Sequence, residues 1–410
     1  MDVGMFEVQD MISGDQAVET TIKVVGVGGA GGNAINRMIA SGLKKVSFVA
    51  MNTDMQALQR SNAQTRITLG KALTEGLGAC GIPEIGEKAA LESKEDIKSE
   101  VEDCDMVFVT AGMGGGTGTG AAPIVAEVAK AANALTVAVV TTPFSFEGKK
   151  KLALAQQGIE KLRDQVDTLI IIPNQYLLNV VENNTPIKQA FLMADEVLYM
   201  GVQGISELIT EPGEINIDFA DVRTVMKGKG DALMGIGFGE GANRAVDAAR
   251  QAISNPLLAN ASIDGAKSVL VNLAGSDSLT IQEYQDVVEL ITENCAEDAL
   301  IIAGQSFNPD LGDRVKVTVV ATGFERASEN VGEHLFTAQP EKIKKVEDSV
   351  KEDVVAKDSD DKANMATITV NRWQDLQQRI GTQANGGEPD DYNIPAVLRY
   401  QKRRDSNTKW

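Results

Sequence analysis

A glycine-rich segment, residues 112–120, is the part of the chain whose residue types best suit phosphate binding. It reads Gly-Met-Gly-Gly-Gly-Thr-Gly-Thr-Gly and follows an apolar run, residues 106–111. Without Cβ atoms, the backbone can turn several N–H groups into one hollow, which suits phosphate oxygens. Thr117 and Thr119 add hydroxyl donors. The segment therefore predicts a phosphate-binding loop.

The residues after this loop strengthen that interpretation. Residues 121–132 are alanine-rich and predict a helix with Pro123 in its first turn, where proline is tolerated. The positive end of the helix dipole would then face the same hollow. A flexible linker is the alternative, but a linker is rarely set between a buried strand and a helix. No Gly-Lys-Ser/Thr follows the glycines, so this is not a Walker loop.

A second glycine-rich turn, residues 26–33, follows a predicted strand at 22–27 and precedes a predicted helix at 34–41. It contains a literal G-x-G-x-x-G, and Asp54 ends the next strand, where an NAD-binding fold places its ribose acid. A dinucleotide needs one such turn, however, whereas two turns can enclose one triphosphate. A third loop, residues 76–81, either serves the terminal phosphate or is an ordinary turn.

Hydrolysis also needs groups that orient water. The candidates are Asn216, Asp218 and Asp221, at the start of a predicted helix. Asp218 and Asp221 are three residues apart, so both carboxylates can lie on one face and polarise one water molecule. The alternative is structural, because Asn216 or Asp218 can cap the helix and Asp221 can favour its positive end.

The sequence Gly-Gly-Gly-Thr-Gly-Thr-Gly at 114–120 resembles the signature loop of the tubulin/FtsZ superfamily, and its surroundings resemble the FtsZ family. The resemblance implies a GTPase that binds GTP or GDP with Mg²⁺. Within it, Glu147 matches an acid that contacts the ribose, Phe191 an aromatic ring against guanine, and Asp195 the acid that binds the base edge. Lys151 stands where the family usually has arginine. The nucleotide ligands implied are Gly29, Ala30, Gly31, Gly32, Asn33, Gly115, Gly116, Thr117, Gly118, Thr119, Glu147, Lys151, Asn174, Phe191 and Asp195.

The resemblance further implies that the active site is shared between subunits. The segment from Asn216 to Asp221 is similar to the loop that enters the nucleotide site of the next subunit in a filament. It implies head-to-tail polymerisation into the cytokinetic ring of bacterial cell division. Two alternatives stay open on the residues alone: an NAD-dependent oxidoreductase and a nucleotide-binding scaffold that does not hydrolyse GTP.

Alternating strands and helices predict an α/β fold with a Rossmann-like parallel sheet covered on both faces. Ligands in such sheets lie at the carboxyl ends of the strands, where both glycine turns fall. The predicted order is a mobile arm (1–20), a nucleotide-binding domain (21–184), a long central helix (185–211), a second α+β domain (212–324), a disordered linker (325–387) and a partner-binding tail (388–410). In the second domain we expect a helix after Asp218, helices at 243–254 and 280–294, and strands at 267–273, 299–303 and 315–322.

Composition excludes several classes of protein. A formal net charge of −19 over 410 residues argues against nonspecific nucleic-acid binding. No signal peptide and no apolar run long enough to span a membrane are recognised, so we expect a cytoplasmic protein. Three scattered cysteines and a single histidine, His334, give no His/Cys metal site.

The last residues differ from the charged linker before them. Residues 390–404 combine a short apolar motif with a basic end, which is typical of a docking peptide, although a frayed tail is the alternative. The segment is similar to the FtsZ peptide that binds membrane tethers and regulators. It implies a protein at the division site that contacts the membrane only indirectly.

Overall fold

A computed structural model describes residues 20–178, 184–211, 213–254, 263 and 265–324. All of these except Asn184 fall into one compact unit. The expected arm apart from Thr20, the linker at 325–387 and the tail at 388–410 lie outside the described residues.

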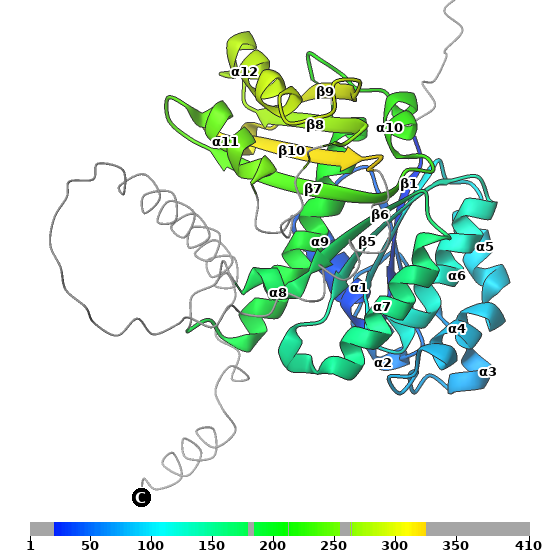
Figure 1. Cartoon of the computed structure of the whole chain (residues 1–410). Coiled ribbons are helices and arrows are strands. Elements are labelled where there is room, and N and C mark those ends of the chain that lie inside the picture. Colours follow the sequence, from blue (N-terminus) through cyan, green and yellow to red (C-terminus); the bar gives the residue numbers. More distant parts are fainter. Residues whose placement is uncertain (1–19, 179–183, 212, 255–262, 264, 325–410) are drawn as a thin grey trace, which may run out of the picture. The chain divides into compact units, whose positions relative to one another are not determined.

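One sheet organises the described chain, with strands in the order β3-β2-β1-β4-β5-β6-β7-β10-β8-β9 (Figure 1). The strands are β1 (Ile22–Val27), β2 (Ser47–Asn52), β3 (Thr65–Thr68), β4 (Met106–Gly112), β5 (Leu135–Thr142), β6 (Thr168–Pro173), β7 (Gly230–Gly239), β8 (Ser268–Gly275), β9 (Leu300–Phe307) and β10 (Val315–Thr322). The α/β fold with a parallel-dominated sheet is thus confirmed.

Strands β1 to β6 are parallel and have the 3-2-1-4-5-6 order of a dinucleotide-binding fold. In that order the chain reverses direction across the sheet between β1 and β4. Helices after these two strands diverge to opposite faces, which leaves a crevice at the carboxyl edge. The two glycine turns follow β1 and β4, so the topology brings both to this crevice.

The helices are α1 (Gly28–Ala40), α2 (Met55–Gln59), α3 (Lys71–Thr74), α4 (Pro83–Glu92), α5 (Lys94–Val101), α6 (Thr117–Ala131), α7 (Lys149–Arg163), α8 (Asn174–Leu177), α9 (Ile187–Thr210), α10 (Phe219–Met226), α11 (Arg244–Ile253) and α12 (Ile281–Thr292), with 3₁₀ turns η1 (Ser145–Glu147) and η3 (Pro309–Leu311). Helices α4 to α7 lie on one side of the parallel strands, and α1 and α9 pack together on the other (Figure 1).

Alternate strand residues fill two apolar layers. Val25 in β1 and Val109 in β4 belong to a core shared with α4 to α7. Their neighbours Val24 and Phe108 are also fully buried and point to the opposite face, because successive side chains in a strand alternate. A sheet buried on both faces requires nearly continuous apolar strands, which explains the sequence pattern.

Two helices begin earlier than the sequence indicates, inside the glycine segments. Helix α1 starts at Gly28 rather than Ala34, and α6 starts at Thr117 rather than Ala121. Pro123 therefore lies inside α6, so its predicted place in the first turn is wrong. The glycines look like loop residues, yet they form first turns because neighbouring backbone leaves no space for side chains. A Cβ at Gly31 would collide with the Thr110 carbonyl oxygen.

Glycines also hid strand β7, which the sequence pattern did not predict. Its segment carries glycine at every second position from 235 to 239. A Cβ at Gly235 or Gly237 would overlap the carbonyl oxygens of α11, so these glycines allow the helix to lie directly on the strand. β7 pairs with β6 over only three residues and continues the sheet into antiparallel β10.

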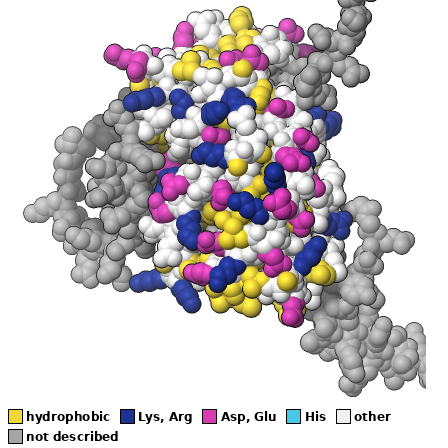
Figure 2. Space-filling view, turned by 90° about the vertical axis from the view of Figure 1, so that its right-hand side faces the viewer, with side chains coloured by type: hydrophobic (Ala, Val, Ile, Leu, Met, Phe, Trp, Pro, Cys, Tyr) yellow, Lys and Arg dark blue, Asp and Glu magenta, His cyan; other side chains and the backbone are white. Residues whose placement is uncertain are grey.

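A buried ion pair joins the long helix α9 to the second half of the sheet. Lys316 Nζ in β10 lies 2.6 Å from Glu207 Oε2 in α9, and both side chains are nearly inaccessible. Gln203 donates to the other Glu207 oxygen at 2.7 Å. Many other charged side chains lie on the surface, and acidic and basic ones are interspersed on the face in Figure 2. Lys161 of α7 pairs with Glu87 of α4 in such an exposed setting.

We predict that Gly31→Ala lowers the free energy of unfolding by about 1–3 kcal/mol, since a methyl group must displace the backbone of β4. Gly29→Ala is the matched control in the same helix turn, because nothing lies within 4 Å of its added Cβ. It should leave stability unchanged or raise it by up to about 1 kcal/mol through helix propensity. Urea unfolding of both variants measures the difference, and equal losses would contradict the packing argument.

We further predict that Lys316→Met lowers the free energy of unfolding by about 3–5 kcal/mol, because it leaves the Glu207 carboxylate buried without its partner. The double variant Glu207→Leu/Lys316→Met should recover most of that loss. Lys161→Met, which breaks an exposed pair, should cost less than about 1 kcal/mol. A similar cost for both single variants would mean that water solvates Glu207.

Candidate functional site

The two glycine turns meet at the carboxyl edge of the sheet. A Cβ at Gly28, the first residue of α1, would lie 2.9 Å from the Gly118 nitrogen in the first turn of α6. The end of β2 joins them, since the Thr53 and Thr117 hydroxyl oxygens are 2.6 Å apart. Both hydroxyl groups therefore lie where three loops converge, and only Thr117 was singled out from the sequence.

The third glycine loop packs against the signature segment. A Cβ at Gly116 would lie 2.9 Å from the Cβ of Ala79 and 2.9 Å from the nitrogen of Ile82. The loop at 76–81 thus forms one side of the same hollow. Leu77 is the most exposed large apolar side chain in the described part of the chain, at 78%. An exposed apolar tip beside this hollow suits contact with another molecule.

The backbone of several glycines in the hollow is accessible to a ligand. Nothing lies within 4 Å of a Cβ built on Gly29, Gly32 or Gly115. Neither α1 nor α6 carries an acid in its first turn, so two positive helix ends face the hollow without compensation. This arrangement suits an anion such as a phosphate chain.

The remaining residues of the two loops differ in their roles. Ala30 packs against Gly112, while Asn33 is exposed on α1. Thr119 is 2% exposed and its hydroxyl oxygen accepts the Gly114 N–H at 2.8 Å. Thr119 therefore holds the shape of the signature loop.

An aromatic cluster lies beside the loops. The rings of Phe144 and Phe191 meet edge to face at 5.3 Å between centroids, and Phe146 stacks on Phe144 at 5.0 Å. Phe191 is 40% exposed despite these contacts. Asn174 is buried, and its Oδ1 has no hydrogen-bond partner among the described residues. The Ser145 N–H donates to Gln175 Oε1 at 3.0 Å, so the segment that carries Asn174 lies against the cluster. A buried acceptor without a described partner in this segment, together with an exposed ring in the cluster, suits a planar polar ligand.

Glu147 and Lys151 form a small unit between this cluster and the signature loop. The Phe144 N–H donates to Glu147 Oε1 at 3.0 Å, and Lys151 Nζ pairs with Glu147 Oε2 at 3.0 Å. A Cβ at Gly114 would lie 2.8 Å from the Lys151 carbonyl oxygen, which places α7 against the loop.

Asp195 in α9 has an unusual protonation equilibrium. Burial raises its pKa to about 7, against the attraction of Arg37 and reinforced by the neighbouring Glu196. Arg37 is committed elsewhere, since its Nε lies 2.5 Å from Glu196 Oε2. The Asp195 carboxyl is thus left for a ligand, and its charge changes near neutral pH.

The three candidates for orienting water lie on and before α10, and all are exposed. Asp218 caps the helix by accepting the Asp221 N–H at 2.8 Å, as the structural alternative predicts. Asn216 Oδ1 accepts the Gly213 N–H at 2.8 Å. Neither Asp221 oxygen is used by the cap, and one Asp218 oxygen also stays free of it.

These acids do not join the other predicted site residues. Arg223 of α10 donates to the Asn133 carbonyl oxygen at 3.0 Å, just beyond the last turn of α6. The signature loop begins the same helix. A helix of 15 residues is about 22 Å long. Figure 1 shows α10 at one end of the parallel strands and α2 and α3, which follow β2 and β3, at the other.

Asp54, the candidate ribose acid of an NAD site, caps α2 instead. Its Oδ1 accepts the N–H groups of Gln56 at 2.8 Å and Ala57 at 3.2 Å. The side chain that supported the oxidoreductase alternative therefore has a local structural role.

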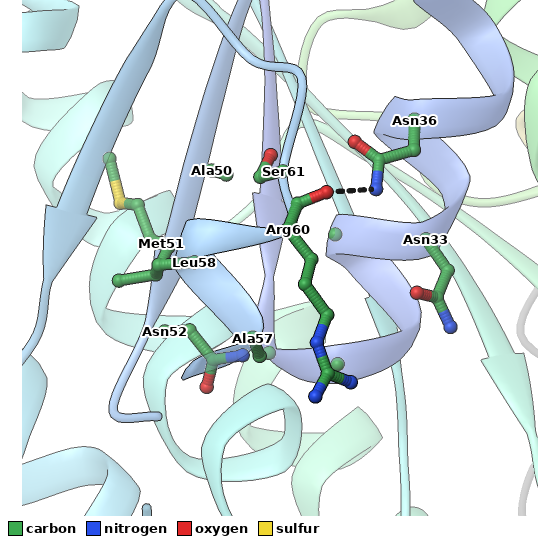
Figure 3. Close-up of a pocket in the computed structure, with 12 residues that line it drawn as sticks. Asn33, Asn36, Ala50, Met51, Asn52, Ala57, Leu58, Arg60 and Ser61 are labelled. Atoms are coloured by element: carbon green, nitrogen blue, oxygen red, sulfur yellow. Dashed lines mark hydrogen bonds between the residues drawn. The ribbon is translucent and has the colours of Figure 1, made fainter. Parts of the chain in front are cut away.

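The structure shows a pocket between α1 and α2 (Figure 3), which joins the predicted ligands Gly29, Gly32 and Asn33 to residues that sequence reasoning missed. It adjoins Gly28 and Gly29 and includes Asn52 and Arg60. Asn52 ends a strand at the ligand-binding edge, so its position was available from the sequence pattern. Arg60 had no such signal, because only the packing of α1 against α2 brings it near the loops.

Within the described ranges, no three His, Cys, Asp or Glu side chains form a group that could hold a metal ion. The same ranges contain no helix of the length and hydrophobicity that a membrane span needs.

Comparison with known proteins places this arrangement in a family. Residues 21–182 match the model of the Tubulin/FtsZ family GTPase domain, and residues 230–325 match that of the FtsZ family C-terminal domain. Two solved structures of FtsZ from M. jannaschii, an empty dimer and a point mutant, are each 48% identical with TM-scores of 0.72. Their alignments cover 75% of this chain and 89% or 92% of theirs.

A more distant likeness concerns the fold alone. CetZ2 from Haloferax volcanii, solved as a GTPγS-bound protofilament, is 20% identical with a TM-score of 0.65, over 77% of this chain and 96% of that one. The 48% identity over most of both chains and the two family matches confirm the resemblance that the signature loop indicated. The chain belongs to the FtsZ family of tubulin-like GTPases, and so it binds guanine nucleotide and hydrolyses GTP.

Proposed function

We propose that this GTPase polymerises head to tail and that Asp218 and Asp221 of one subunit complete the nucleotide site of the next. The observation that supports this is that the phosphate-binding loop and the acids of α10 lie at opposite ends of α6. Acids beyond the far end of a helix about 22 Å long cannot act on a nucleotide held by the loop at its start. They can act on a neighbour's nucleotide if subunits stack along that axis.

A contact of this kind joins two different surfaces and does not close on itself. Such heterologous interfaces generate filaments. The nucleotide loops, with exposed Leu77 at one wall, would form one surface, and exposed α10 the other. Hydrolysis then depends on assembly, because only the interface holds both nucleotide and acids.

The chemistry asked of α10 is the orientation of one water molecule. The exposed carboxylates of Asp218 and Asp221 accept its hydrogens and polarise it toward the terminal phosphate. Asn216 supports the segment through its bond to Gly213. Mg²⁺ would offset the charge of the phosphate chain. The loops supply the Thr53 and Thr117 hydroxyl groups rather than carboxylates, so phosphate and water oxygens would provide most of its ligands.

Guanine would bind at the aromatic cluster. Phe191 offers an exposed ring face, Asn174 an unpartnered acceptor and Asp195 a carboxylate for the N–H groups of the base. Glu147 lies between cluster and loop, where the ribose would pass. Donor groups on the base edge favour guanine over adenine at a carboxylate.

On this basis we place the protein in the cytoplasm, in filaments that form the cytokinetic ring at the division site. The support is family membership and the FtsZ dimer among its relatives. Residues 390–404 would connect the filament to membrane tethers and regulators. That segment lies outside the described residues, so its sequence alone supports the assignment.

The decisive experiment uses Asp218→Asn and Asp221→Asn. Asparagine caps helices about as well as aspartate, so Asp218→Asn keeps α10 while removing the charge. We expect GTP affinity to stay within twofold and phosphate release to fall about 100-fold or more. Asp247→Asn, an exposed acid in the first turn of α11, is the control and should change neither quantity.

Phosphate release per molecule is then measured as wild-type concentration rises. A rate near zero that increases above a threshold is expected if the site forms only between subunits. A constant rate per molecule, or loss of GTP binding in both Asn variants, would refute the shared site.

Binding of guanine nucleotide should depend on pH through Asp195. Its pKa of about 7 means that roughly a tenth of the carboxyl is ionised at pH 6 and most of it at pH 8. We expect affinity to fall about tenfold from pH 8 to pH 6, beyond any effect of the phosphates. In Asp195→Asn the nucleotide phosphates still titrate, but the carboxyl at position 195 does not. The difference in pH dependence of affinity between the wild type and this variant therefore gives the contribution of Asp195.

The same raised pKa has a cost for the empty protein. Between about pH 4 and pH 7 the unfolded state ionises this carboxyl while the folded state keeps it protonated, so stability falls as pH rises through that range and is lowest above 7. Asp195→Asn should therefore raise the free energy of unfolding at pH 8 by about 1 to 4 kcal/mol, since each unit of the shift is worth about 1.4 kcal/mol and burial of the amide offsets part of the gain. Thermal or urea unfolding without nucleotide tests this, and a loss of stability would contradict it.

A further inference from the structure

The pocket between α1 and α2 contains a cation that the proposed function does not use. It has a volume of about 130 Å³ and is lined by the first turns of α1, the end of β2 and α2. We propose that Arg60 binds the phosphate chain of the nucleotide from this side, as a positioning residue for GTP. The inference rests on the proposed nucleotide site at the glycine loops.

Hydrogen bonds hold the backbone of Arg60 in place, while its side chain extends into the pocket. Arg60 is the C-cap of α2, and its carbonyl oxygen accepts the Asn36 Nδ2 of α1 at 3.2 Å. In Figure 3 the side chain runs from that anchor along the pocket toward the first turn of α1, and the guanidinium lies near Ala57. Gly28 and Gly29, whose N–H groups face the hollow, line the same pocket.

The guanidinium has no carboxylate to neutralise it. Arg60 makes no ion pair with any residue that the structure describes, and the pocket lining contains no Asp or Glu. Asp54, at the other end of α2, uses Oδ1 to cap the helix. A free planar fork of N–H donors suits bidentate binding of a phosphate.

Asn52 adds a second donor to the pocket. It is 6% exposed, and its Oδ1 accepts the Asp54 N–H at 3.2 Å. Its amide nitrogen has no partner among the described residues and points toward Ala57 in the pocket (Figure 3). Amide, guanidinium and the N-terminus of α1 are all donors, so the pocket has the chemistry of an anion site.

Sheet order indicates which part of the nucleotide reaches this pocket. The aromatic cluster lies after β5, where Phe191 of α9 meets it, the signature loop follows β4, and the pocket lies at β2 beyond β1. A nucleotide with its base at the cluster and its phosphates over the two glycine turns therefore presents its terminal phosphate to Arg60. The contribution of Arg60 should grow with the number of phosphates.

Calorimetric titration of the full chain with GTP, GDP, guanosine and orthophosphate tests this, for the wild type, Arg60→Gln and Arg60→Lys. Arg60→Gln should weaken GTP binding about tenfold, GDP binding by less and guanosine binding by less than twofold. Arg60→Lys should recover part of the loss, since it keeps the charge without the fork. Arg66→Gln is the matched control: it removes an exposed charge from nearby β3 and should change each affinity by less than twofold.

Three results would overturn the inference. They are an equal loss for guanosine and GTP, an Arg60→Gln effect no larger than that of Arg66→Gln, and loss of orthophosphate binding with unchanged GTP affinity. The last would assign the pocket to a free anion. If the wild type itself bound no guanine nucleotide, the proposed nucleotide site would fail first, which distinguishes the two failures.

Discussion

The constraint on which the rest of this structure depends is the close approach of two helix N-termini at one point on the sheet edge. Helix α1 follows β1 and α6 follows β4, and the strand order makes these neighbours the place where the chain reverses direction. Gly28 lies against Gly118, and Gly31 against the Thr110 carbonyl, at separations that exclude any side chain. Backbone N–H groups and two positive helix ends are thereby concentrated in one hollow. An anion is the natural occupant of such a hollow, and the specificity for guanine must come from residues farther away.

The same geometry divides the chemistry between the two ends of the molecule. All strands of a parallel sheet run in the same direction, so the loops that follow them lie together at the carboxyl edge. Helix α10 precedes β7, whose first residues pair with the start of β6, and so it lies at the amino edge. Arg223 fixes it against the end of α6. A rigid helix then separates the binding loops from the acids, and assembly becomes the simplest way to bring them together.

Several polar groups are placed to bind ligands, although their placement lowers the stability of the protein without a ligand. Asn174 keeps a buried acceptor that no described residue satisfies, and Asp195 keeps a carboxyl whose ionisation burial opposes. Arg60 extends along a pocket without a carboxylate partner among the described residues. Glu207 and Lys316 show the contrast, since that buried pair is closed by mutual contact and by Gln203. Polar groups that a ligand can reach are thereby distinguished from a buried pair whose partners both belong to the fold.

The sequence by itself determined the parallel α/β fold, the phosphate loop and the long helix, because apolar runs, glycine clusters and helical periodicity are local patterns. Family motifs in the same segments added the nucleotide ligands as expectations. Only the tertiary structure decided where some glycine-rich segments form helices or strands. Helix α1 begins at Gly28, α6 begins at Thr117 and residues 230–239 form a strand, because backbone contacts with distant segments set these elements. It also placed α10 far from the signature loop, and Arg60 beside the first glycine turn. Distances between elements depend on how the sheet orders its strands, and no local pattern encodes that order.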